Sequence, residues 1–121
     1  MKFLRIWGPA AFCLLLIIIA TSIPNLDTSR WPGWDKVFHL SVYGLWAMLC
    51  LRALHLSRQG KGTVLISVVL LGILVGAADE FHQKFIPGRT VSLSDFAYNV
   101  AGFVLGMAAG YIRYFRRGKS L

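Results

Sequence analysis

Hydrophobic positions follow one another along this chain in four long runs without a charged residue, and short polar segments separate the runs. The uncharged runs are Ile6–Leu26, Val37–Leu51, Gly62–Ala78 and Phe96–Ile112. About 17–25 mostly apolar residues cross a bilayer as a helix, and basic residues that flank a shorter run can extend their stems to the interface. The pattern therefore predicts an all-α integral membrane four-helix bundle, with helices near 4–23, 35–54, 62–84 and 92–114.

Little of the 121-residue chain lies outside these four helices. We therefore expect one transmembrane domain over residues 1–121, without a water-soluble domain or an internal repeat. Lys2 and Arg5 precede the first apolar run, as they would in a secretory signal peptide. No clear small-residue cleavage site follows that run, so we expect the segment to be kept as a helix.

Basic residues give the chain a formal net charge of +8, and their distribution indicates a topology. In a four-span arrangement, nine of the 13 basic residues fall on one side of the membrane: Lys2, Arg5, Arg52, Arg58, Lys61, Arg113, Arg116, Arg117 and Lys119. Cytoplasmic loops are enriched in lysine and arginine, so both termini are predicted to be cytoplasmic. Because topology explains the excess, and no nucleic-acid-binding motif accompanies it, we expect no nucleic-acid partner.

All acidic residues fall on the opposite side of this topology: Asp27, Asp35, Asp79, Glu80 and Asp95. His39 and His82 lie on that side too. Ionisable side chains within membrane spans are costly and usually functional. Any chemistry is therefore predicted at the extracytoplasmic face, just within the membrane interface.

Helical phase groups the polar residues further, because a helix turns by about 100° per residue. Single helix faces carry Asp35, His39 and Tyr43 in the second helix, Asp79, Glu80 and Gln83 in the third, and Asp95 and Asn99 in the fourth. Deeper positions of the last two faces are glycines, namely Gly72, Gly76, Gly102 and Gly106. Small residues four apart let helices approach closely, so we expect the third and fourth helices to meet at these glycines.

The segment between the third and fourth helices contains a turn signal. Pro87 and Gly88 fit the central positions of a type II turn, which would hold Arg89 near the mouth of the polar group. Ser92 is a predicted N-cap, and capping is the alternative role for Asp95. For Asp79 and Glu80 the alternative is a structural ion-pair network with Arg89, Lys84 or Lys36, and for His39 a single hydrogen bond in the bundle. Cys13 and Cys50 are expected to be reduced thiols, without a disulfide or a zinc site.

The polar motifs resemble those of the VanZ-like family. The resemblance lies in Asp35-Lys36-x-x-His39-x-x-x-Tyr43, in Asp79-Glu80-x-x-Gln83-x-x-x-Pro87-Gly88-Arg89, and in Asp95-x-x-x-Asn99-x-x-Gly102-x-x-x-Gly106. It implies a small multi-pass protein of the bacterial cytoplasmic membrane, in a family whose namesake is associated with resistance to teicoplanin. The resemblance implies no settled mechanism, so the chemistry has to be argued from the residues.

Those residues suit an enzyme that acts on a lipid phosphate or a lipid-linked envelope precursor. Asp79 or Glu80 would act as nucleophile or general base, and His39, oriented by Asp35, as acid or base. Lys36 and Arg89 would hold a phosphate. The candidate catalytic residues are thus Asp35, His39, Asp79, Glu80 and Asp95, and the candidate substrate-binding residues are Lys36, Tyr43, Gln83, Arg89 and Asn99.

Other interpretations of the same residues stay open. The side-chain oxygens of Asp35, Glu80, Asp95 and Asn99 would suit Mg²⁺ or Ca²⁺. A non-catalytic protein would use the same polar mouth to bind or shield a lipid-linked precursor or a glycopeptide antibiotic. A proton-coupled transporter is a third class, for which four short helices leave little room. The sequence specifies no oligomeric state.

Overall fold

The computed structural model describes residues 1–24 and 33–116, and every regular element in these ranges is helical. The elements are α1 (Lys2–Thr21), α2 (Trp34–Leu56), α3 (Lys61–Gln83), α4 (Leu93–Tyr111) and a short π-helical extension of α4, η1 (Ile112–Arg116). This confirms the all-α prediction, and each of the four helices begins and ends within three residues of its predicted range. The charged residues Asp27, Arg117 and Lys119, used in the topology prediction, lie outside the described residues.

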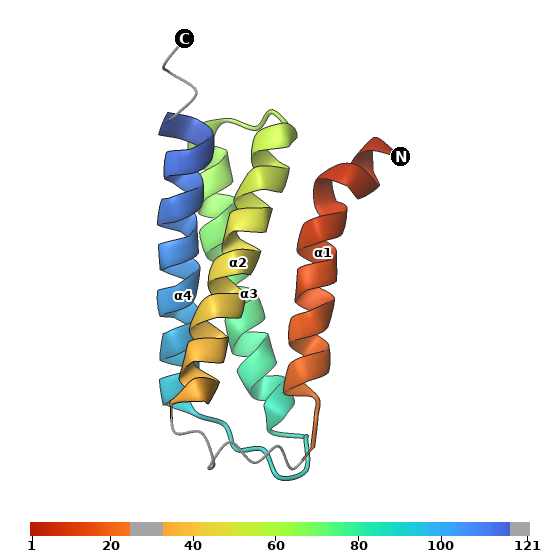
Figure 1. Cartoon of the computed structure of the whole chain (residues 1–121), viewed down its shortest axis with the longest axis vertical. Helices are drawn as coiled ribbons and strands as arrows, with labels where there is room; N and C mark the ends of the chain where they lie inside the picture. The colour runs from red at the N-terminus through yellow and green to blue at the C-terminus, as the bar shows by residue number, and fades with distance from the viewer. Residues whose placement is uncertain (25–32, 117–121) are drawn as a thin grey trace.

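The helices run up and down side by side, so that the start of α1 and the end of α4 lie at the same end of the bundle (Figure 1). α1 packs on α2 and α3, and α4 packs on the same two helices. The end that carries the α2–α3 connection is the basic end. The opposite end, where α3 is joined to α4, is the acidic end, because Asp35, Asp79, Glu80 and Asp95 lie there (Figure 1).

Three of the helices, α1, α2 and α3, are long and apolar enough to cross a membrane. α4 carries Asp95 and Asn99 in its first two turns, which lowers its apolar content. Large hydrophobic side chains are exposed on all four helices, among them Phe12, Leu45 and Leu74. Such a surface is unfavourable in water and suits contact with lipid.

The closest helix contact lies between α2 and α4. A Cβ atom on Gly102 would overlap the carbonyl group of Leu40, and one on Gly106 would overlap that of Gly44. The expectation that the glycines of α3 and α4 meet each other is therefore wrong. Aromatic rings of α4 occupy the glycine face of α3 instead: Gly72 faces Phe103, and Gly76 faces Phe96.

An apolar core fills the bundle between its two ends. Trp46 and Phe103 meet there with their ring centroids 5.6 Å apart. Cys13 and Cys50 are buried in this core as free thiols. The core therefore separates the acidic end from the basic end with side chains that carry no charge.

Candidate functional site

Six buried polar side chains from α2, α3 and α4 gather at the acidic end. None of them is more than 7% exposed. We call this set the polar cluster: His39, Tyr43, Asp79, Glu80, Gln83 and Asn99. Sequence reasoning named all six as candidate site residues, and the structure brings them together within the bundle.

Asn99 links two members of the cluster. Its side-chain Nδ2 donates to Glu80 Oε1 at 3.4 Å, and its Oδ1 lies 2.7 Å from His39 Nδ1. Because the amide nitrogen faces a carboxylate, the amide oxygen is the acceptor for the histidine. Nδ1 of His39 therefore carries a proton, and in the neutral ring Nε2 does not.

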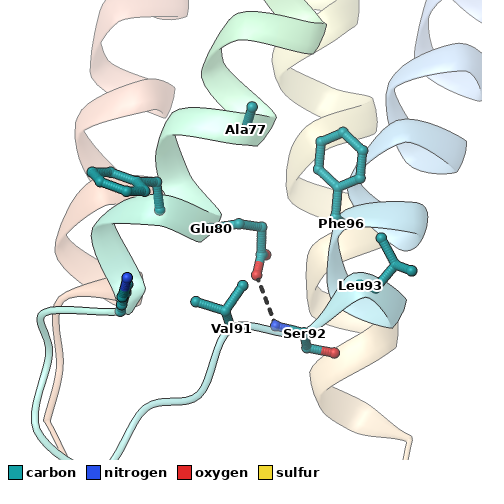
Figure 2. Close-up of a pocket in the computed structure, with 8 residues that line it drawn as sticks. Ala77, Glu80, Val91, Ser92, Leu93 and Phe96 are labelled. Atoms are coloured by element: carbon teal, nitrogen blue, oxygen red, sulfur yellow. Dashed lines mark hydrogen bonds between the residues drawn. The ribbon is translucent and has the colours of Figure 1, made fainter.

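The two carboxylates of α3 accept further hydrogen bonds. Tyr43 donates its hydroxyl to Asp79 Oδ2 at 2.9 Å. The backbone N–H of Ser92 donates to Glu80 Oε2 at 3.4 Å, and Figure 2 shows this bond from α3 to the start of α4. Gln83 is buried beside them, one turn further along α3, and its Nε2 has no hydrogen-bond partner in the described part of the chain. The carboxylates are thus fixed by neutral donors.

Asp95 lies at the rim of the cluster, half-buried, and has two neighbours. Its backbone N–H donates to Ser92 Oγ at 3.2 Å, which confirms Ser92 as the N-cap of α4. Its carboxylate Oδ2 lies 3.9 Å from His39 Nε2. Within residues 1–24 and 33–116 this is the one contact within 4.0 Å between an acidic side chain and a histidine, lysine or arginine, so no described lysine or arginine pairs with Asp79 or Glu80.

The orientation of His39 differs from the one expected. Sequence reasoning assigned it to Asp35, four residues earlier on the same helix. In the structure Asn99 holds Nδ1 and Asp95 faces Nε2, so residues of α4 orient the ring instead. Asp35 is half-buried in the first turn of α2, and the Nζ atom of its neighbour Lys36 lies 5.6 Å above the ring of Tyr98. Catalysis by Asp35 and phosphate binding by Lys36 stay predictions.

Arg89 holds the end of α1. Its Nε and Nη2 donate to the carbonyl oxygens of Ile23 and Ala20, each at 3.1 Å. The last carbonyls of a helix lack intrahelical partners and carry partial negative charge, so a guanidinium there is favourable. A second tie is the 2.9 Å contact between Ser22 Oγ and His82 Nε2. Sequence reasoning missed this role, because the sequence does not indicate that the end of α1 lies beside Arg89 in the folded bundle.

An open groove of about 620 Å³ runs between α3 and the start of α4. Most of its lining is apolar, including Phe81, Leu93 and Phe96, and Glu80 reaches into it from α3 (Figure 2). Lys84, at the end of α3, lines it as well. A smaller crevice of about 280 Å³ between α1 and α3 reaches Asp79. The polar cluster therefore borders openings on two sides of the bundle.

The sequence model of the VanZ/LLP1 family matches residues 5–114. The chain belongs to the VanZ/LLP1 family. It is 29% identical over 107 residues to an uncharacterized protein of the fission yeast Schizosaccharomyces pombe, a match that covers 88% of this chain. The chain spans 65% of the length of that relative. No solved structure matches the chain. The family resemblance expected from the motifs is confirmed.

Proposed function

We propose that this member of the VanZ/LLP1 family acts on the phosphate-bearing headgroup of a membrane lipid or lipid-linked envelope precursor, by hydrolysis or transfer. The observation that carries the proposal is the position of Glu80. Glu80 belongs to the buried polar cluster and also lines an apolar groove that opens to the side of the bundle. A lipid tail fits against Phe81, Leu93 and Phe96 in such a groove, while its headgroup reaches Glu80.

The cluster contains the groups that such a reaction needs. In hydrolysis, Glu80 or Asp79 takes a proton from a water molecule, and the water oxygen attacks phosphorus. The bond between phosphorus and the lipid oxygen breaks, and the proton passes to that oxygen. His39 is held by Asn99 at 2.7 Å, which fixes its ring beside the carboxylates for proton transfer. Lys84 lines the groove, where it would attract the phosphate.

We propose further that the acidic end faces the outside of a bacterial plasma membrane and that both termini are cytoplasmic. The described residues of the basic end support this orientation, since they include Arg52, Arg58, Lys61, Arg113 and Arg116 and no acid. A reporter fused after Leu121 tests it. Activity of a cytoplasm-specific reporter is expected, and activity of an external reporter would reverse the orientation.

A second candidate function is binding without catalysis. Both carboxylates already accept hydrogen bonds, from Tyr43 and from Asn99 and Ser92, as in a preformed binding site. Such a protein would shield a lipid-linked precursor, or would bind a glycopeptide such as teicoplanin.

Purified protein in detergent, incubated with a panel of lipid phosphates, tests the proposed reaction. The wild type is expected to release phosphate or exchange the headgroup, and Glu80→Gln is expected to do neither. His82→Gln is the matched control at the same end of the bundle, outside the polar cluster. Saturable lipid binding without turnover in all three proteins would favour the binding function, and neither binding nor turnover would contradict both.

A further inference from the structure

The polar cluster holds two carboxylates and no described cation to balance them. Asp79 is 7% exposed and Glu80 is 5% exposed. Their hydrogen-bond donors, from Tyr43, Asn99 and Ser92, are all neutral. In the described ranges, 1–24 and 33–116, no lysine or arginine lies within ion-pair distance of either carboxylate. Buried carboxylates are normally paired with a cation or coordinate a metal ion, so this arrangement indicates a missing positive charge.

We propose that the polar cluster binds a divalent transition-metal ion through His39, Asp79 and Glu80. One ligand atom from each of these residues lies within 4.8 Å of the others. Ligands bound to one ion at about 2.0–2.2 Å lie within roughly 4.4 Å of each other, so small side-chain movements would close the site. All three residues sit on regular helices, which fixes their relative positions before an ion binds.

The surroundings of His39 fit this role. Asn99 Oδ1 accepts the hydrogen bond from Nδ1, and a ligating histidine is typically held in this way at its other nitrogen. Nε2 has Asp95 Oδ2 opposite it at 3.9 Å, which is too long for a hydrogen bond. Asp95 adds a third carboxylate at the rim, and its negative charge would strengthen cation binding.

Gln83 provides independent support, because its buried amide group lacks a hydrogen-bond acceptor that a bound ligand could supply. Its side chain is 1% exposed, and in the described part of the chain its Nε2 has no acceptor. It follows Asp79 by four residues and Glu80 by three on α3, and long side chains in a helix lean back over the preceding turn. The Gln83 side chain therefore leans toward the turn that carries the two carboxylates, without a hydrogen bond from its Nε2 to either. A water molecule or a phosphate oxygen bound to the metal ion would give this buried donor the acceptor it lacks.

The ligand set favours particular metals. Imidazole suits zinc and iron, and carboxylates suit manganese, whereas Mg²⁺ prefers oxygen ligands and keeps most of its water. We therefore expect Mn²⁺ and Zn²⁺ to bind more tightly than Mg²⁺. This proposal rests on the proposed function, because the metal ion would be a cofactor of the same site. The experiment for the metal site measures metal binding and not lipid turnover, so either proposal can fail while the other stands.

The experiment uses chelator-treated full-length protein in detergent, titrated with Mn²⁺ while the signal of free Mn²⁺ is followed by electron paramagnetic resonance. One ion per chain is expected, displaced by Zn²⁺ but not by a large excess of Mg²⁺. His39→Gln and Glu80→Gln are each expected to weaken binding by about ten-fold or more. His82→Gln makes the same substitution at the same end of the bundle, outside the cluster, and should bind Mn²⁺ like the wild type.

Absence of saturable Mn²⁺ and Zn²⁺ binding by the wild type would overturn the proposal, and so would an equal loss in His82→Gln. If the cluster variants do not fold, pulsed electron paramagnetic resonance on wild-type protein with bound Mn²⁺ tests the site instead. Coupling of the Mn²⁺ electron spin to an imidazole nitrogen is expected. Mn²⁺ that is bound without nitrogen coupling would exclude His39 as a ligand and overturn the site.

Discussion

The two ends of the bundle differ in whether their charged side chains are exposed or buried. At the basic end, Arg58, Lys61 and Arg113 are exposed, and His55 is exposed beside the ring of Phe115, with centroids 4.9 Å apart. At the acidic end, Asp79 and Glu80 are buried inside the bundle. Exposed basic residues need no further explanation than contact with water and lipid headgroups. Buried carboxylates are costly to stability, so we attribute the presence of Asp79 and Glu80 at the acidic end to function.

The arginines of the two ends also differ. Arg89 makes two hydrogen bonds of 3.1 Å to the end of α1, whereas Arg52 makes a single longer bond of 3.4 Å to the carbonyl of Ile6 in the first part of α1. The C-terminal end of α1 is therefore joined to the rest of the bundle by more and shorter arginine hydrogen bonds than its N-terminal part.

The largest expected effect comes from removing the Glu80 charge. We expect Glu80→Gln to lower turnover of a lipid phosphate by roughly 10²–10⁴-fold, the range for loss of a general base. Lys61→Gln at the basic end removes an exposed charge and should leave turnover unchanged. Phosphate release measured under identical detergent conditions checks both. Equal losses in the two variants would remove the functional distinction between the ends.

The next effect is on stability and compares two glycines of α4. In Gly102→Ala the new methyl group would meet the backbone carbonyl of Leu40, which cannot move aside, and the expected loss is about 1–3 kcal/mol. In Gly110→Ala, nearer the basic end, the nearest atom is Cδ1 of Leu51 at 2.8 Å, which can change rotamer. Thermal unfolding followed by circular dichroism should rank Gly102→Ala as the less stable variant. The reverse order would contradict the close approach of α2 and α4.

A smaller effect on stability is expected from removing the arginine hydrogen bonds to α1. Arg89→Ala removes two hydrogen bonds and a favourable charge at a helix C-terminus, and should cost about 1–2 kcal/mol. Arg52→Ala should cost less, because its single bond is long. Hydrogen exchange of the last turn of α1 should rise in Arg89→Ala and stay unchanged in Arg52→Ala. Protection of that turn in both variants would show that Arg89 does not hold it.

Much of this architecture could be predicted from the sequence. Uncharged runs predict the helices because lipid excludes charge. Polar side chains at helical spacing predict the residues of the polar cluster, including His39 and Asn99. What could not be predicted depends on how the helices rotate and cross. The orientation of His39 by Asn99, and the contact of Gly44 with Gly102 and Gly106, both follow from the close approach of α2 and α4. The contacts of Arg89 depend in the same way on how α1 packs against the rest of the bundle.

The central claim is that the buried carboxylates are kept for function and not for stability. Asp79→Asn tests it most directly, because the asparagine oxygen can still accept the hydrogen bond from Tyr43 while the buried charge is removed. The measurement is the melting temperature of the metal-free variant in detergent, compared with metal-free wild type. A melting temperature equal to or above that of the wild type is predicted. A variant that melts several degrees lower would mean that the charge stabilises the fold, and would contradict the account.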